Sequence, residues 1–428
     1  MRRVSATKTQ KKSSRPYDIV LWGATGFTGQ LVAEYLTRKY GVDREVKWAL
    51  AGRNQSKLEQ VRAQLVAVDA KAANLPIILG DATDRASLAA VVAPARVVIT
   101  TVGPYAVHGK EMVAAAVDHG TDYVDLTGET NFAREMIDLH HARAQETGAR
   151  IVHCCGFDSI PSDLGTLVIQ NEMQARHGMR CGEVKFYMGE ASGGISGGTL
   201  ASMMNLFTSA ASDRNLRRLM GDPYALNPDR SQRGPDGRDQ HGPRWDADMK
   251  RWTGPFVMAA INTRVVRRSN ALLGWQYGRD FRYSECMSFG TGPKGWLTAA
   301  GLTAGLAGFA MASTFAPTRK LLEKKLPGPG EGPSKEKRDK GFFVVRLLGI
   351  GEKANGAAAP RLLETVRGQA DPGYGESAKM LSESALCLAK DGVKAAGGVL
   401  TPAACMGMPL VERLRQAGMT FAVEEAGA

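Results

Sequence analysis

The sequence lacks the cysteine patterns that hold metal ions or disulfide frameworks. Its 428 residues include six cysteines, with no CxxC pair and no histidine at zinc-finger spacing. The sequence therefore predicts neither a metal site nor a disulfide-stabilised fold, and a reducing compartment is the default. Cys154 and Cys155 are adjacent and follow a strand-like run, and we interpret both as small buried hydrophobic residues rather than as a redox pair.

Acidic residues are missing from the first 17 residues, which carry six lysines and arginines. This composition is typical of a disordered segment, so we predict a disordered basic tail over 1–16. A transit peptide is the alternative, although the tail has no apolar helical face. The apolar segment of a secretory signal is also missing. A Ser-His-Asp order and the paired carboxylates of a glycosidase are missing too, which argues against those hydrolase classes.

Basic residues are concentrated between Arg244 and Arg282, together with several aromatic residues. A nucleic-acid interface would need these cations on one folded face with stacking aromatics. Three aspartates, Asp246, Asp248 and Asp280, dilute the charge. We therefore interpret the stretch as a solvated or substrate-facing surface of an enzyme domain, and we predict no nucleic-acid partner.

The chain length and the pattern of apolar residues predict two domains. With 428 residues, of which 43% are hydrophobic, the chain exceeds the usual size of one core. From Tyr17 onward, strand-like runs alternate with helical spacing, which is typical of an α/β fold with a parallel, doubly wound Rossmann sheet. A helix is predicted over 56–66, with Ser56 as its N-cap. The predicted strands are 19–22, 47–51, 76–79, 96–101, 123–126 and 150–155.

Beyond about residue 180 this alternation is lost. Proline, glycine and charged residues accumulate between Asp222 and Pro243, which predicts a long surface loop. We assign 17–175 to the Rossmann dinucleotide-binding domain and 176–370 to an α+β substrate domain. Residues 371–428 are predicted to form C-terminal helices that return to the Rossmann domain.

An uncharged segment lies between Lys294 and Arg319. It is long enough to span a bilayer, but alanine, glycine and threonine dominate it. Trp296 at one end and basic residues at the other are typical of a helix on an anionic membrane surface. Three interpretations of 295–317 stay open: peripheral membrane association, a helix buried in the core or in a homodimer interface, and a true span. The predicted location is cytoplasmic, with membrane association as the alternative.

Three glycines in the order GxxGxxG stand between the first predicted strand and the following helix. The first permits a tight turn, the second leaves room for a pyrophosphate, and the third lets the helix pack closely on the sheet. Backbone N–H groups at the helix N-terminus bind phosphates in such loops, and threonine hydroxyls add donors. The predicted phosphate-binding residues are Gly23, Thr25, Gly26, Phe27, Thr28 and Gly29.

The end of the second predicted strand indicates which dinucleotide binds. NAD sites usually carry an acidic residue there, whereas this sequence has Arg53 and Asn54, with Lys57 one turn further on. Because an arginine can bind a 2′-phosphate with two hydrogen bonds, NADP(H) is predicted over NAD(H); an exposed surface charge is the alternative for Arg53. Asp81 would approach the adenine. The residues predicted near the nicotinamide are Thr101, Gly103, Pro104 and Tyr105.

Several motifs together resemble the saccharopine dehydrogenase-like oxidoreductases, and most closely the bacterial branch that contains the mycobacterial trans-acting enoyl reductases. The matching stretches are 17–29, 51–53, 102–105, 123–129, 155–163 and 397–402. The resemblance implies a second α+β domain inserted before the C-terminal helices. It also implies an NADP-dependent oxidoreductase that reduces a carbon-carbon double bond in a hydrophobic acyl or polyketide-like substrate. The arginine-rich recognition of an amino diacid cannot be traced here.

Two alternatives stay open beside this function. One is a non-catalytic NADP-binding scaffold or sensor that docks a membrane or a partner, and the other is an imine or amino-acid dehydrogenase of saccharopine type. Enoyl reduction needs a hydride from the nicotinamide and a proton donor beside it. The predicted catalytic residues, all after the fourth strand, are Tyr105, His108 and Lys110.

Each of these catalytic residues has a simpler interpretation. Tyr105 would stack on the nicotinamide, His108 would be a loop histidine, and Lys110 would start a helix. Asp158 and Ser159, in the turn after the sixth strand, are predicted to contact substrate or, alternatively, to cap the next helix.

Overall fold

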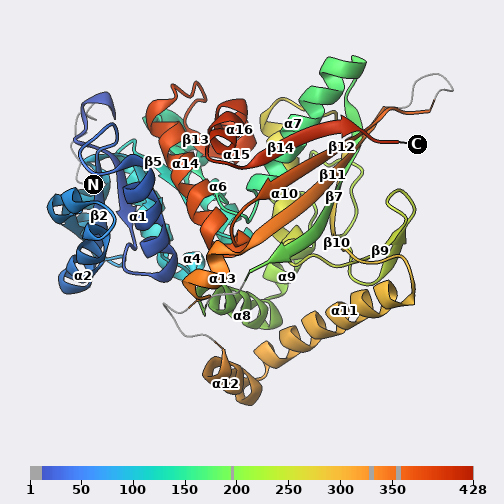
Figure 1. Ribbon diagram of the computed structural model, residues 1–428, viewed down its shortest axis with the longest axis horizontal. Coiled ribbons are helices and arrows are strands. Elements are labelled where there is room, and N and C mark those ends of the chain that lie inside the picture. Colours follow the sequence, from blue (N-terminus) through green and yellow to red (C-terminus); the bar gives the residue numbers. More distant parts are fainter. Residues whose placement is uncertain (1–11, 194–196, 327–331, 353–357, 428) are drawn as a thin grey trace.

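The computed structural model of the chain describes residues 12–193, 197–326, 332–352 and 358–427. Within these residues, two seven-stranded sheets lie next to each other, and helices from the C-terminal part of the chain pack between them (Figure 1). A long helix and a shorter one run along one side of the molecule. The predicted α/β class with a second domain is confirmed.

The first sheet is parallel throughout, in the order β13-β6-β5-β4-β1-β2-β3. The chain turns back at β1, so the topological switch point, where doubly wound sheets bind ligands, lies between β1 and β4. The six predicted strands are present, with slightly different ends. The strands are β1 (Tyr17–Trp22), β2 (Trp48–Gly52), β3 (Ile77–Leu79), β4 (Ala95–Thr100), β5 (Asp122–Val124), β6 (Arg150–Val152) and β13 (Gly398–Leu400).

Helices cover both faces of this sheet, as the alternating side chains of β1 require. Ile19 and Leu21 belong to the core shared with one set of helices, whereas Val20 and Trp22 belong to the core shared with the other. One set is α1 (Phe27–Tyr40), α2 (Gln55–Val66) and α14 (Ser377–Lys390), and the other is α3 (Arg85–Val92), α5 (Lys110–Asp118) and α6 (Thr130–Thr147).

The second sheet is mixed, in the order β14-β12-β11-β7-β10-β9-β8. β10 pairs in parallel with β7, and the other pairs are antiparallel. Its strands are β7 (Cys181–Ser192), β8 (Arg244–Asp246), β9 (Arg251–Gly254), β10 (Arg282–Ser288), β11 (Phe342–Gly351), β12 (Arg361–Gly368) and β14 (Thr420–Glu425). Two helices pack on it, α7 (Ile160–His177) and α10 (Ala259–Leu272).

The remaining helices are short or lie at the edges of the two domains. They are α4 (Tyr105–His108), α8 (Gly197–Ser212), α9 (Arg214–Gly221), α11 (Pro293–Thr314), α12 (Ala316–Lys325), α13 (Lys335–Asp339), α15 (Pro402–Cys405) and α16 (Gly407–Gln416). Short helical turns are η1 (Lys12–Ser14), η2 (Ala70–Asn74) and η3 (Pro372–Glu376).

The C-terminal part of the chain differs from the prediction, because it contributes strands as well as helices. β13 extends the Rossmann sheet beyond β6, and β14 forms an edge of the second sheet. The predicted C-terminal helices are present as α14 (Ser377–Lys390) and as two further helices within 402–416, and the two strands are the part that the prediction left out. The C-terminal segment completes both sheets and joins them.

The predicted tail is ordered where it reaches the Rossmann domain. Lys12 forms an ion pair with Asp122, with 2.5 Å between Nζ and Oδ1. Arg15 is buried and donates to the carbonyls of Ala95 and His119. The prediction of disorder is wrong for residues 12–16, because these side chains find buried acceptors; residues 1–11 lie outside the described residues.

The basic stretch is not a surface where it crosses α10. Arg264, Arg267 and Arg268 are all buried on this helix. Arg267 pairs with Asp236 at 2.7 Å, and Arg264 pairs with Asp239. Both aspartates come from the loop 222–243, so this loop supplies counter-charges to a buried helix. The interpretation of these arginines as surface charges is wrong.

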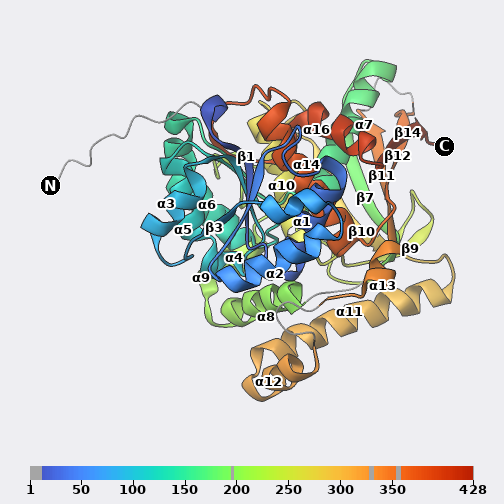
Figure 2. The same ribbon diagram turned by 60° about the vertical axis from the view of Figure 1, so that its left-hand side comes forward.

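The uncharged segment forms α11, which lies along the outside of the molecule (Figure 2). In the most apolar 18-residue stretch of this helix, only 11% of the residues are buried. Phe207 of α8 meets Phe309 with 6.2 Å between the ring centroids, and Thr208 donates to the carbonyl of Ser313. The interpretation as a helix buried in the core of the chain is wrong. Among the described residues, α11 is the one helix long and apolar enough to cross a membrane.

Candidate active site

The predicted phosphate loop lies at the carboxyl end of β1, at the switch point of the sheet. Gly23 has a φ of +86°, a conformation that favours glycine. A Cβ on Gly29 would lie 2.1 Å from the carbonyl oxygen of Gly23, so α1 can approach the loop only with glycine there. At Gly26 the nearest atom would be 3.4 Å away, which leaves this side of the loop open.

The first turn of α1 is free to bind an anion. The helix begins after Gly26, and no side chain in the described structure caps this end. The N–H groups of the first turn therefore lack intrahelical acceptors, and the helix dipole favours negative charge at this point. Glycine geometry and the open helix end together form a site that fits a pyrophosphate.

Arg53 directly follows β2 and is exposed. In the described part of the chain, no carboxylate lies within 4 Å of its guanidinium group. Hydrogen bonds from Thr83 are the main cause that lowers the pKa of Asp81, and the charge of Arg53 adds a smaller effect. Asp81 Oδ1 accepts from the backbone and hydroxyl of Thr83. The loop thus offers a free guanidinium beside the open phosphate site, which suits a 2′-phosphate.

Asn54 has a structural role that the sequence analysis assigned to Ser56. Asn54 Oδ1 accepts from the backbone N–H of Lys57 and from the hydroxyl of Ser56, and α2 begins at Gln55. The prediction of Ser56 as the N-cap is wrong by two residues. The side chain of Lys57 is exposed on the first turn of α2.

Tyr105 lies in the hydrophobic core that covers one face of the Rossmann sheet. The ring is buried against Phe132, and burial raises the pKa of its phenol well above the usual value. The hydroxyl donates to the carbonyl of Thr100 at 3.1 Å. The side chain of Thr101 likewise binds the backbone, with 3.1 Å to the carbonyl oxygen of Gly23. Tyr105 is therefore a core residue, and its assignment as a catalytic or stacking residue is wrong.

His108 and Lys110 lie at the end of α4 and the start of α5. Lys110 is paired with Glu135 on the surface, with 2.7 Å between Nζ and Oε1. His108 is exposed at the last residue of α4. His108 ends α4, the helix that follows the cis Gly103–Pro104 peptide, and Lys110 begins α5. Lys110 stands at a helix start, as its simpler interpretation predicted, whereas His108 belongs to a short helix and not to a loop.

Glu129 connects three segments at the carboxyl edge, by which we mean the edge of the Rossmann sheet where the carboxyl ends of its strands lie. Its carboxylate accepts from the backbone N–H groups of Tyr105 and Ala106, at 2.8 and 2.9 Å, and so caps α4. It also accepts from the hydroxyl of Ser202 on α8, at 3.2 Å. A Cβ on Gly103 would lie 3.8 Å from this hydroxyl. The second domain therefore reaches the position where a nicotinamide would lie.

A buried network around Asp125 shapes the ends of β5 and β6. Asp125 accepts from the hydroxyl of Tyr123, from the backbone N–H of Cys154, and lies 2.6 Å from His153 Nδ1. Cys154 has a φ of +63°, which is unusual for a residue with a side chain and is typical of functional sites. Cys154 and Cys155 are buried free thiols, as predicted. The network holds the next turn, which carries Asp158, in place.

Among the described acids at this edge, Asp158 combines a partly exposed carboxyl group with a raised pKa, which suits proton transfer. It is half-buried beside Gly128 and Gly156, and a Cβ on Gly156 would lie 2.7 Å from its Oδ2. Burial, supported by the charge of Asp125 and opposed by a backbone hydrogen bond, raises the pKa of Asp158 to about 7. Near neutral pH, the Asp158 carboxyl group is therefore protonated in a large fraction of the molecules.

Ser159 precedes α7 at the N-cap position but does not cap it with its side chain. Its hydroxyl donates to Asn262 Oδ1 on α10 at 3.0 Å, and Ser159 is fully buried. Both the substrate role and the capping role of this side chain are therefore wrong. The turn is also held from the C-terminal segment, because the backbone N–H of Phe157 donates to Ser377 Oγ at 3.0 Å.

One residue of the second domain and one of the C-terminal segment pack against Phe27 of the phosphate loop. The ring of Phe27 meets Tyr374 with 5.1 Å between centroids, and the guanidinium carbon of Arg338 lies 5.4 Å from the Phe27 centroid. Tyr374 also lies 3.1 Å from the hydroxyl of Thr199 on α8. Ser202, Arg338 and Tyr374 cannot be recognised from the sequence, because each comes from a segment distant from the phosphate loop and no local pattern marks it.

The residues at this edge are suited to acid-base catalysis and to binding a dinucleotide. Among the described residues, no group of three or more histidine, cysteine, aspartate or glutamate side chains is placed to hold a metal ion. The glycine loop, the open end of α1 and Arg53 fit a phosphorylated dinucleotide.

Comparison with known proteins agrees with this geometry. Residues 19–152 match the model of the saccharopine dehydrogenase NADP binding domain. A Mycobacterium tuberculosis relative provisionally named a trans-acting enoyl reductase is 43% identical over 423 residues, covering 95% of this chain and 97% of the relative. Trans-acting enoyl reductases of Mycobacterium bovis and Mycobacterium ulcerans are 40% and 39% identical over 96% and 95% of this chain, and these alignments cover 98% and 97% of the relatives.

A solved structure shows the same fold at low sequence identity. The saccharopine dehydrogenase (L-Glu forming) of Saccharomyces cerevisiae superposes with a TM-score of 0.57 at 13% identity, covering 96% of this chain and 99% of the yeast chain. The six-strand prediction, the second domain and the resemblance to this family are confirmed together. The chain belongs to the saccharopine dehydrogenase-like family, together with the mycobacterial trans-acting enoyl reductases.

Proposed function

We propose that this protein is an NADPH-dependent oxidoreductase that reduces a carbon-carbon double bond, conjugated to a carbonyl, in a hydrophobic acyl substrate. The observation that carries the proposal is Asp158, a half-buried acid with a pKa of about 7 on the same sheet edge as the phosphate loop. The names of the full-length relatives support the enoyl substrate class.

Each part of the edge has one task in this reaction. The loop 23–29 and the first turn of α1 hold the pyrophosphate, and Arg53 binds the 2′-phosphate. The bound cofactor supplies the hydride to the β carbon. Asp158 donates its proton to the α carbon, which neutralises the enolate, and water then returns a proton to the carboxylate. Glu129 keeps α4 and α8 in place beside the reacting groups.

A direct assay tests this function. NADPH consumption is measured with a panel of α,β-unsaturated acyl thioesters of increasing chain length and, in parallel, with cyclic imines and amino acid plus keto acid pairs. We expect consumption with the enoyl substrates, increasing with chain length. Consumption with imines alone would replace this proposal by a saccharopine-type activity. Tight NADPH binding without turnover on any substrate would favour a scaffold or sensor.

We also propose that the protein works at an anionic membrane surface, onto which α11 and α12 dock. Large apolar side chains are exposed along both helices, and the basic side chains of α12 lie beside them. The exposed apolar residues are Trp296, Leu297, Met311, Phe315 and Leu321, and the basic residues are Arg319, Lys320, Lys324 and Lys325. Apolar contacts bind the lipid interior, and the cations select anionic headgroups.

A further inference from the structure

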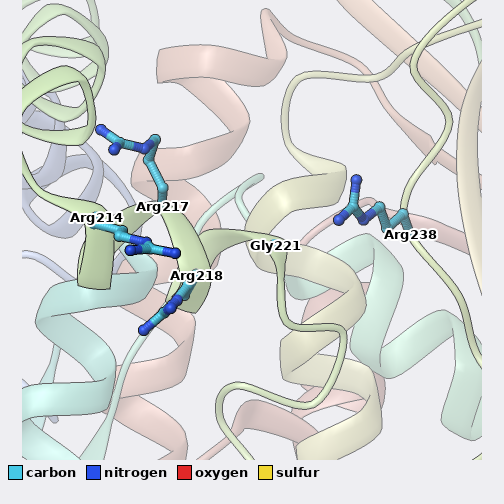
Figure 3. Close-up of a pocket in the computed structure, with 5 residues that line it drawn as sticks. All are labelled: Arg214, Arg217, Arg218, Gly221 and Arg238. Carbon is cyan, nitrogen blue, oxygen red and sulfur yellow. The ribbon is translucent and has the colours of Figure 1, made fainter.

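A cavity of about 400 Å³ opens on the surface between α9 and the loop 222–243. Four arginines and one glycine line it: Arg214, Arg217, Arg218, Gly221 and Arg238. Figure 3 shows three of the arginines on α9 and Arg238 on the facing loop, with its guanidinium group turned toward α9. We call this cavity the arginine hollow. It lies outside the carboxyl edge described above.

The charges of the arginine hollow are not neutralised by the protein. In the described residues, no carboxylate lies within 4 Å of any of the four guanidinium groups. The nearby loop acids are already paired with other arginines: Asp222 with Arg230 and Arg233, Asp236 with Arg267, and Asp239 with Arg264. The side chains on α9 point in different directions and Arg238 faces them from the loop (Figure 3), and an anion in the hollow would be attracted by these cations.

The arginines that line the hollow are the residue type that binds phosphate groups best. Guanidinium groups form paired hydrogen bonds with phosphate oxygens, and they are weakly hydrated for a cation. Arg217 is already held in place, because its Nη1 donates to the carbonyls of Ala210 and Ala211 at 2.7 and 2.8 Å. Asp213 uses its Oδ1 to cap α9, accepting from Asn215 and Leu216.

Helix α8 connects the arginine hollow to the carboxyl edge. Its Ser202 binds Glu129 there, and its last residue, Ser212, is separated from α9 by Asp213 alone. The ten residues from Ser202 to Ser212 correspond to roughly 15 Å of helix. A ligand that lies along α8 can therefore have one end at the edge and the other in the hollow.

We propose that the arginine hollow binds a phosphate group on the handle that carries the acyl substrate, so that the double bond reaches Asp158 along α8. The proposal rests on the enoyl reduction proposed above. Two sources present a phosphate on an acyl carrier: a phosphopantetheine thioester, as in coenzyme A, and a phospholipid headgroup. Both ligands share one feature: a phosphate group that lies about the length of helix α8 from the carbons that react.

Binding measurements test the hollow without turnover. Calorimetric titrations use the full chain with saturating NADPH, so that the dinucleotide site is filled. The titrants are coenzyme A, phosphate-free pantetheine, a short-chain phosphatidic acid below its micelle concentration, and inorganic phosphate. We expect coenzyme A or the lipid phosphate to bind, pantetheine not to bind, and the tighter of the two phosphates to identify the source.

Position 221 offers a matched pair of variants. No atom lies within 4 Å of a Cβ built on Gly221, so a longer side chain fits there. Gly221→Glu places a carboxylate among the arginines, whereas Gly221→Gln has the same shape without the charge. We expect Gly221→Glu to weaken binding of the phosphate ligand at least tenfold, Gly221→Gln to weaken it little, and both to bind NADPH as the parent does. Arg214→Ala/Arg218→Ala should resemble Gly221→Glu, and Lys71→Ala/Arg143→Ala should resemble the parent.

The outcomes separate this proposal from the proposed function. Equal binding of pantetheine and coenzyme A, unchanged binding in Gly221→Glu, or binding of inorganic phosphate alone would each overturn the hollow as a handle site. If the phosphate ligand binds as expected but no enoyl compound is reduced, the site stands and the proposed reaction fails. If enoyl thioesters are reduced with the same KM in Gly221→Glu, the reaction stands and the site fails.

Discussion

The charge at residue 53 should separate the two dinucleotides. Arg53 is exposed beside the phosphate loop, where a 2′-phosphate would lie. Since a hydrogen bond to a charged group contributes about 1.5 to 3 kcal/mol, Arg53→Ala should weaken NADPH binding by about 10- to 100-fold. NADH binding should change little. Fluorescence titration with both nucleotides measures this, with Arg44→Ala as a control for charge alone. An equal loss of both affinities would contradict the role of Arg53.

The proton of Asp158 should give the reaction its pH dependence. The pKa of this carboxyl is raised to about 7, and it donates a proton only in its protonated form. The value of kcat should therefore be level at low pH and decrease as the pH rises through about 7. Asp158→Asn should lower kcat by about 10²- to 10⁴-fold, with KM little changed, and should abolish this pH dependence. A variant with the parental pH profile would show that another group is the donor.

At the residue scale, the sequence predicts the groups that act through the backbone better than those that act through tertiary contacts. Glycine spacing identifies the phosphate loop because the turn constrains neighbouring residues only. Tyr105 follows the right strand, but its side chain enters the core because Phe132 packs against it there. The acidity of Asp158 is set by burial and by Asp125, which no local pattern reveals.

The second domain depends on a buried helix, α10, whose charges are matched by a loop. Arg264 is 1% exposed, and its partner Asp239 lies on the loop 222–243. Removing one partner of a buried ion pair leaves an uncompensated charge, so Asp239→Ala should lower the free energy of unfolding by about 3 kcal/mol or more. Asp118→Ala, which breaks an exposed pair with Arg85, should cost less than about 1 kcal/mol. Chemical denaturation measures the free energy of unfolding of both variants. Equal losses would show that the buried pair stabilises the fold no more than the exposed pair does.

At the element scale, local periodicity predicts the six strands of the Rossmann half and misses the strands that complete each sheet. β13 has three residues, which is too short for an alternation signal, and it forms because β6 offers an open edge. β14 pairs with β12 across more than fifty residues of chain. Pairing of this kind depends on the whole fold, because the strand gains its hydrogen bonds only after the partner strand is in place.

The whole molecule is organised so that the cofactor loop, the acid and the second domain converge. The C-terminal segment adds β13 to one sheet and β14 to the other, and Ser377 fixes the turn that carries Asp158. Because of this arrangement, α8 and η3 are held over the nucleotide loop, where Thr199 meets Tyr374. The same scaffold leaves α11 outside both cores, with its apolar side chains exposed. Because the protein does not bury these apolar side chains of α11, we expect a membrane or another protein surface to cover them.

Vesicle binding tests that partner for α11 and α12. The protein should sediment with vesicles that contain phosphatidylglycerol and not with pure phosphatidylcholine, and the binding should weaken with salt, because each basic residue contributes about 1 kcal/mol at an anionic surface. Phe315→Asp should abolish binding, whereas Leu139→Asp on α6 should not, although each parent side chain is 62% exposed. Analytical ultracentrifugation measures whether the parent protein is a dimer. If it is a dimer that Phe315→Asp dissociates, and if the parent does not bind vesicles, then a second copy of the chain covers α11 instead of lipid.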